Sequence, residues 1–212
     1  MKTKLTAILI FFILSKMLNA QITLSIIPKA GISLSNINAS SNGITESYKN
    51  IVGFTGGVAF GMSFNEHISL QPEILYVHKG ARLKYSDTYE SIDIKFNVNY
   101  LEVPILFKYS YGPIYFNVGP YAGVKISQNL KVKEISPNTT ITEGSSNLKS
   151  LDYGLLFGGG CAFEVGTGKI IIDARYGLGV ANINTNDDTT QSITTKNRSL
   201  QFTVGYSFQL GK

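Results

Sequence analysis

The chain has very little of the residues that build disulfides, metal centres and nucleophilic active sites. In 212 residues it contains one cysteine, Cys161, two histidines, His67 and His78, and no tryptophan. A single cysteine excludes an intramolecular disulfide. With two histidines, neither a metal-ligand cluster nor a nucleophile–base–acid set is visible. We therefore predict that the protein is not an enzyme and has no catalytic, cofactor-binding or metal-binding residues, and the sequence assigns no particular binding residue.

The chain also has little excess charge. It carries 19 basic and 14 acidic residues, a formal net charge of +5. Lys2, Lys4 and Lys16 lie in the first 20 residues, which contain no acidic residue, so the remainder has 16 basic residues against 14 acidic ones. So small an excess gives no reason to expect a nucleic-acid partner.

The N-terminus has the pattern of a secretory signal peptide. Lys2 and Lys4 precede a ten-residue apolar run at 5–14, and Leu18-Asn19-Ala20 is an acceptable cleavage site before Gln21. The run is too short for a membrane-spanning helix, which needs about 20 apolar residues. We predict a signal peptide at 1–20 and a single domain at 21–212.

The rest of the chain is rich in segments in which apolar and polar or small residues alternate. In 200–210, Leu200, Phe202 and Val204 share one face of an extended chain, and Gln201 and Thr203 share the other. This period of two is typical of a β-strand. Eight segments show it: 26–36, 52–64, 67–79, 97–109, 114–126, 153–165, 169–180 and 200–210.

The connections between these segments alternate strictly between long and short. Polar loops are predicted at 37–50, 80–94, 127–150 and 181–197, and tight turns at 65–66, 110–113 and 166–168. Pro72 and Pro104 fall inside two strands, where a ladder tolerates proline only if a bulge accommodates it. We predict an all-β, eight-stranded, antiparallel up-and-down barrel in which segment 200–210 pairs with segment 26–36.

Three features favour a transmembrane barrel over a soluble one. Long loops alternate with short turns, as extracellular loops and periplasmic turns do. Strands of roughly 11–13 residues fit a tilted crossing of the bilayer. Aromatic residues gather at the strand ends nearest the short turns, as in an interfacial girdle: Phe64, Phe107, Tyr109, Phe116, Phe163 and Phe208. Charged residues recur on the polar face of the strands, which by itself is compatible with either kind of barrel: Lys29, Glu73, Glu102, Lys108, Lys125, Glu164, Asp173 and Arg175. We predict a Gram-negative outer-membrane protein in contact with outer-membrane lipid, with both termini periplasmic. The alternative is an exported lipocalin-like binder, although the chain lacks the tryptophan of that family's G-x-W signature.

Several blocks of sequence resemble the PorT-family outer-membrane β-barrels of Bacteroidetes. The blocks are KAGISLSNI (29–37), SLQPEILYVHKG (69–80), NYLEVPILFKY (99–109), PIYFNVGPYAGV (113–124) and RYGLGVANI (175–183). The resemblance implies an eight-stranded outer-membrane barrel whose aromatic C-terminal strand is recognised by the barrel-assembly machinery. The founding member of that family is tied to type IX secretion, a role that does not transfer to this chain by resemblance alone.

The inward charges are expected to pair with one another, because buried charges need partners. Glu73 and Glu102 on neighbouring strands could reach Lys108 or Lys125, while Asp173 is placed to pair with Arg175. Such pairs would form a structural plug, and the alternative is a gated polar conduit.

Function would then reside in the loops, of which 127–150 is the best candidate surface for an unknown extracellular ligand or envelope protein. We expect a structural barrel or a surface binding or adhesion module. The alternative is a passage or assembly component for a small solute or a secreted protein.

Overall fold

The computed structural model describes residues 22–41, 44–86, 91–134, 139–143, 148–185 and 194–210. These residues form β-strands joined by turns and short connections. No helix in this part of the chain is long and apolar enough to span a membrane. The predicted signal peptide at 1–20 lies outside the described residues.

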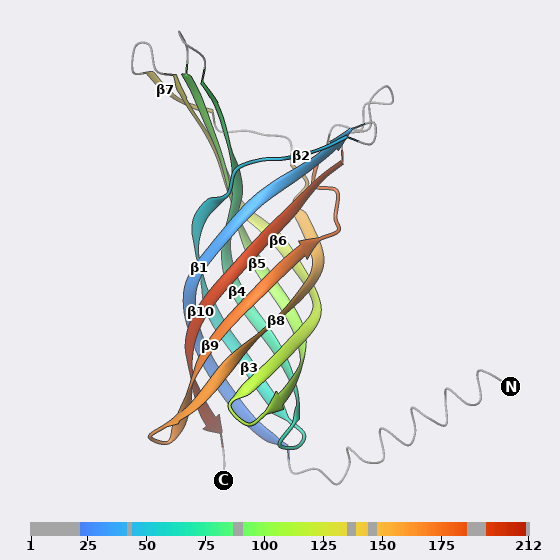
Figure 1. Cartoon of the computed structure of the whole chain (residues 1–212), viewed down its shortest axis with the longest axis vertical. Coiled ribbons are helices and arrows are strands. Elements are labelled where there is room, and N and C mark those ends of the chain that lie inside the picture. Colours follow the sequence, from blue (N-terminus) through green and yellow to red (C-terminus); the bar gives the residue numbers. More distant parts are fainter. Residues whose placement is uncertain are drawn as a thin grey trace, which may run out of the picture.

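Eight long strands form one closed antiparallel ring (Figure 1). They are β1 (Thr23–Ser41), β3 (Ile51–Ser63), β4 (Ile68–Ser86), β5 (Ser91–Tyr111), β6 (Ile114–Glu134), β8 (Leu151–Val165), β9 (Gly168–Gly179) and β10 (Thr194–Leu210). Two short strands add to this ring at its loop end: β2 (Ile44–Ser47) pairs with β1, and β7 (Thr139–Glu143) pairs with β6. The β1–β10 pairing closes the ring, with Ile32 opposite Phe202. The predicted strand number, strand order and closing pair are confirmed.

The alternation of side chains produces an apolar outer wall and a polar interior. Along β5, Leu101, Val103 and Ile105 are between 43% and 48% exposed, whereas Glu102 and Leu106 are completely buried. Lys29, Glu73, Lys108, Asp173 and Arg175 are also buried inside the ring, while Lys125 is half-buried and Glu164 is exposed at its rim. A lipocalin-like barrel needs the opposite arrangement, with an apolar interior, so this interior argues against that alternative.

The short turns form one end of the barrel, where β1 begins and β10 ends (Figure 1). The outer wall at this end carries exposed aromatic side chains, as expected from the sequence. They are Phe107, Tyr109, Phe116, Phe163 and Phe208, joined by Tyr111, which is 76% exposed. Aromatic rings are favoured at the boundary between hydrocarbon and water, so this girdle marks one edge of the apolar wall.

Several strands are longer than predicted. Parts of the loops predicted at 37–50 and 181–197 are strand, since β1, β2 and β10 extend into them, and the strands on one side of the ring extend further. The strands β4, β5 and β6 contain 19, 21 and 21 residues, so most of the loop predicted at 80–94 and the first part of that at 127–150 are strand. They continue to pair well above the barrel, where Lys95 lies opposite both Arg82 and Lys131. The loop prediction was wrong there because the charged residues occupy only one face of a sheet.

The two prolines do not cause the bulges that the sequence suggested. Pro72 pairs with Ile105 and Leu75 pairs with Glu102, which is the same register on either side of the proline. The register shift in this region lies instead between Asn99 and Tyr100, in the pairing of β5 with β6.

Arginine on the outer wall of β10 should be far more damaging than a conservative change at the same place. We expect Phe202→Arg or Val204→Arg to lower the free energy of unfolding by roughly 2–4 kcal/mol, because the charge would enter hydrocarbon. The measurement is urea unfolding in lipid vesicles, followed by heat-modifiable gel mobility, with Val204→Leu as the matched control. Equal tolerance of all three changes would contradict the assigned outer face.

Candidate functional site

Four charged side chains meet in the interior on the side of the short turns, and we call them the turn-side ion cluster. They are Lys29 of β1, Glu73 of β4, and Asp173 and Arg175 of β9. Arg175 binds Glu73 with Nη1 at 2.7 Å and Asp173 with Nε at 2.6 Å. Lys29 Nζ lies 3.5 Å from Glu73 and 3.9 Å from Asp173. Two cations therefore neutralise two carboxylates, all four at least 94% buried.

A second group of charges lies deeper along the same interior, toward the long loops, and we call it the loop-side ion cluster. Lys79 of β4 pairs with Glu102 of β5 and, at 3.0 Å, with Asp152 of β8. Its ammonium also lies 4.5 Å from the centre of the Tyr121 ring. Asn197 of β10 donates to Asp152 at 2.9 Å. One ammonium thus holds two carboxylates from neighbouring parts of the ring.

An apolar layer separates the two ion clusters. Leu75, Leu106 and Leu156 occupy the inward positions between them along β4, β5 and β8, and each is completely buried. Leu106, Leu156 and Tyr121 pack together as one hydrophobic cluster. On other strands the inward positions carry small or polar side chains, among them Ser33, Thr55 and Gln201, and these are buried too. Side chains therefore fill the interior, which forms a plug.

The inward charges do pair with one another, as predicted, but some of the predicted partners are wrong. Asp173 does pair with Arg175, as expected. Glu73 and Glu102 do not pair with Lys108 or Lys125: Lys108 Nζ lies 3.6 Å from the centre of the Tyr115 ring. Lys125 instead donates to Gln128 and to the Leu148 carbonyl.

Lys79 and Asp152 were not predicted from the sequence to be partners in the interior. A signal for Lys79 existed, because it shares the odd-numbered inward positions of Glu73, Leu75 and Val77 on β4. Asp152 likewise alternates with the outward residues Leu151 and Tyr153. Both lie at the end of a predicted strand, where the periodicity alone does not separate wall from loop.

A glycine makes room for the tyrosine that completes the turn-side cluster. Tyr115 donates to Asp173 Oδ2 at 2.7 Å. A Cβ atom on Gly160 would lie 2.1 Å from the Ile172 carbonyl oxygen and 2.5 Å from the Tyr115 hydroxyl. The glycine run at 158–160 therefore serves close strand packing within β8, and no helix follows it that could complete a phosphate loop.

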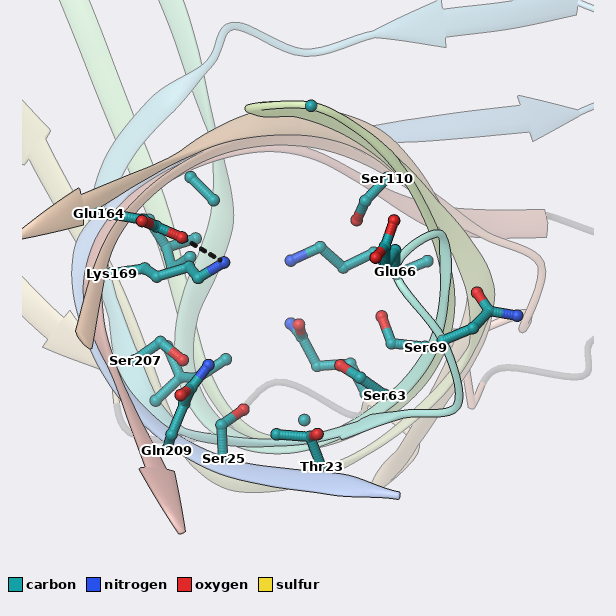
Figure 2. A pocket seen from close by; sticks show the side chains of 18 residues that line it. Thr23, Ser25, Ser63, Glu66, Ser69, Ser110, Glu164, Lys169, Ser207 and Gln209 are labelled. Carbon is teal, nitrogen blue, oxygen red and sulfur yellow. Dashed lines mark ion pairs between the residues drawn. The ribbon is translucent and has the colours of Figure 1, made fainter. Parts of the chain in front are cut away.

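The short-turn end of the barrel opens into a polar cavity of about 420 Å³ (Figure 2). Hydroxyl groups surround its opening: Ser25, Ser63, Ser69, Ser110 and Ser207. Lys169 and Glu164 form an ion pair across 3.3 Å at its edge. Ile27 and Ile171 also line it, and they belong to a packed cluster with Ala59 and Tyr115. The cavity is thus a cup that ends at the plug.

The residue types that commonly bind metals are dispersed in the part of the chain that the structure describes. No group of three or more His, Cys, Asp or Glu residues is placed to hold a metal ion there. His67 contacts the Ser110 carbonyl at the short-turn end, and His78 contacts Asn97 near the loop end. Cys161 lies on the outer wall between Ile114 and Ile172, as predicted.

Above the barrel, β4, β5, β6 and β7 continue as a small sheet that leans to one side (Figure 1). Its two faces differ. The outward face, which continues the outer wall, carries a set that we call the basic face: Arg82, Lys84, Lys95 and Lys131. The inward face is apolar and carries Ala81, Leu83, Ile94, Phe96, Leu130 and Val132.

One acidic residue, Asp93, lies among the basic residues of this outward face. Arg82 binds it with two hydrogen bonds of 2.7 and 2.5 Å. These hydrogen bonds lower the pKa of the Asp93 carboxyl. Asp93 is therefore ionised at neutral pH and cancels one of the four basic charges.

A closed ring with an apolar outer wall, an aromatic girdle and a charged, filled interior defines a transmembrane β-barrel of the outer-membrane class. The sequence assigns the chain to a family within this class. The chain belongs to the family described as the outer membrane protein beta-barrel domain, whose model matches residues 19–185. It is a small outer-membrane β-barrel protein.

Solved structures with a similar fold include proteins of quite different kinds. Ail, the attachment invasion locus protein of Yersinia pestis, solved with the heparin analogue sucrose octasulfate, is 18% identical, with 88% of this chain and 99% of that chain covered and a TM-score of 0.42. The outer-membrane protein AlkL in DMPC bilayers is 13% identical, with 90% and 91% covered and a TM-score of 0.44.

The outer-membrane protease OmpT of Escherichia coli is 9% identical to this chain, with 91% and 98% covered and a TM-score of 0.38. Identities this low concern the fold alone. No curated protein sequence matches the chain.

Breaking the turn-side ion cluster should destabilise the barrel strongly. We expect Arg175→Met to lower the free energy of unfolding by about 3–5 kcal/mol, because Glu73 and Asp173 would keep buried charges without their main partner. Adding Glu73→Gln should recover part of that loss. The measurement is equilibrium unfolding in vesicles, and the control is Arg82→Met, a half-buried ion-pair partner outside the barrel whose loss should cost at most about 1 kcal/mol. Similar stability of Arg175→Met and the wild type would contradict the role of the cluster.

Proposed function

We propose that this outer-membrane barrel is a surface module that binds an extracellular ligand or envelope protein through its loop end and performs no catalysis. The supporting observation is the contrast between its two halves. The interior is filled by two ion clusters and an apolar layer, whereas β4 to β7 build a sheet well beyond the barrel. An extension of this size serves neither closure of the ring nor packing of the interior, so it is the part available for recognition.

The proposal includes an orientation and a processing step. Residues 1–20 are removed as a signal peptide, both termini lie in the periplasm, and the long loops face the exterior. Short turns at the end where β1 begins and β10 ends support this orientation, because barrels of this class keep short turns on the periplasmic side. The PorT-like sequence blocks and a Bacteroidetes origin, together with recognition by the barrel-assembly machinery, remain predictions within the same proposal.

The main alternative is a passage or assembly component, for a small solute or a secreted protein in a manner similar to type IX secretion. Passage through the ring itself would require moving the plug, in which Glu73, Glu102, Asp152 and Asp173 are each held by a cation. Nothing observed in the described residues favours that movement.

Purified protein in planar bilayers should show no steady ionic conductance, because the closely packed interior side chains leave no continuous water path. A matched variant should behave differently. Replacing Leu75, Leu106 and Leu156 together by serine should hydrate the apolar layer and produce measurable current above the wild-type baseline. Reproducible single-channel steps in the wild type would favour the passage alternative.

Shortening the third loop should abolish surface binding without affecting transport. The variant replaces 135–147 by a short Gly/Ser linker and keeps Lys131, and the control replaces 186–193 by a linker of equal length. Cells producing each chain are compared for attachment to immobilised sulfated polysaccharide, neutral polysaccharide and albumin, and for uptake of a fluorescent small solute and protein secretion. Loss of attachment in the first variant alone is expected. Normal attachment with impaired uptake or secretion would instead support the passage alternative.

A further inference from the structure

The outer surface of the strands changes its chemistry abruptly at one level of the barrel. The rows that run across β4, β5 and β6 can be followed through the register of the sheet. The row of Tyr76, Leu101 and Val124 is apolar. The next two outward rows, His78-Asn99-Ser127 and Gly80-Asn97-Asn129, are polar or lack a side chain, and the third is Arg82-Lys95-Lys131.

The same change occurs on the far side of the ring. On β10 the outward residues Phe202 and Leu200 are followed by Arg198 and Lys196. Hydrocarbon requires apolar side chains and the aqueous boundary accepts charged ones. The level at which both sides change therefore marks the edge of the membrane at the loop end, and the basic residues lie just beyond it.

The distance from that edge suits contact with lipid headgroups. The Arg82-Lys95-Lys131 row lies four residues past His78-Asn99-Ser127, about 13 Å of strand at roughly 3.3 Å per residue. At the usual strand tilt of about 40° this is about 10 Å of height. Long basic side chains bend back toward the interface from such a position, so their charges reach the headgroup layer.

The charges of this face are largely available for a ligand. Among the described residues, Asp93 is the one acidic group on the outward face of the extension, and Arg82 binds it. Lys84, Lys95 and Lys131 are exposed and form no ion pair with any residue that the structure describes. The signs alternate in one row, where Lys84 lies opposite Asp93, but Arg82 already binds that carboxylate. In the neighbouring row Lys95 stands directly opposite both Arg82 and Lys131, where a sheet stabilised by its own ion pairs would place an acidic residue.

We propose that the basic face of Arg82, Lys84, Lys95 and Lys131 binds the phosphate groups of lipids in the leaflet at the loop end, and so anchors the extension over the membrane surface. This proposal rests on the proposed function in one respect: the orientation given there decides which leaflet lies at the loop end. Basic clusters next to a membrane span are attracted to anionic headgroups, by about fivefold in affinity per residue. Like charges in adjacent strands repel one another, so phosphates between them would also relieve that repulsion.

The test compares three forms of the full-length protein in detergent. The first is the wild type, and the second is the triple variant Lys84→Gln, Lys95→Gln, Lys131→Gln. The third is a charge-matched control, Lys125→Gln, Lys149→Gln, Lys169→Gln, whose lysines lie outside the basic face. Binding of diphosphorylated lipid A is measured by titration, with dephosphorylated lipid A, inorganic pyrophosphate and heparin as further probes. Heat-modifiable gel mobility establishes that each form is folded.

We expect the triple variant to bind diphosphorylated lipid A at least about tenfold more weakly than the wild type, and the control to bind it like the wild type. Dephosphorylated lipid A should bind all three forms weakly. Equal binding by the triple variant and the wild type would overturn the proposal. If the wild type bound pyrophosphate or heparin as tightly as lipid A, the face would bind anions in general, and the proposal that its ligand is a lipid would be overturned. This experiment does not measure the attachment of cells. A negative result would therefore contradict lipid binding alone, and the proposed surface function is tested separately by the loop replacement.

Discussion

In the hydrocarbon core of a bilayer no water can bond to a backbone amide, so a sheet that crosses it must have no free edge. The seam between β1 and β10 meets that constraint along a register that runs from Leu24 opposite Leu210 to Ser40 opposite Thr194. In the closed ring, each side chain within the membrane faces either the hydrocarbon or the interior. The strict alternation of Leu101, Glu102 and Val103 is a direct consequence.

Closure also determines what the interior contains. A ring of eight strands is just wide enough for side chains to fill it, so charges that point inward lose most of their water. They persist because each finds a partner from another strand, as Glu73 does with Arg175 and Asp152 does with Lys79. The plug is therefore part of the fold, and in the function we propose the barrel holds its loop end at the membrane surface.

The sequence alone was sufficient for the number of strands and the face that each residue occupies, because both depend on local alternation. It was also sufficient for the strand order and the closing pair, because consecutive strands pair as neighbours and a sheet in hydrocarbon must close on itself. It was insufficient for the ion-pair partners. Arg175 meets Glu73 across 102 residues of sequence, and which charges come together depends on the stagger of strands around the ring, which no local pattern contains. The extensions of β4 to β6 were missed for a different reason, since the average polarity of 80–94 resembles a loop.

The extensions of β4 to β6 nevertheless carry a pattern by which they can be recognised. Within the membrane the outward residue is apolar and the inward one polar, as for Leu101 and Glu102. Beyond it the alternation continues with its sign reversed, because Lys95 faces outward and Phe96 inward. A loop would have lost the alternation altogether. A strand that leaves hydrocarbon for water keeps its period of two and exchanges its faces, so the residue at which the exchange occurs locates the membrane boundary more sharply than any average of hydropathy.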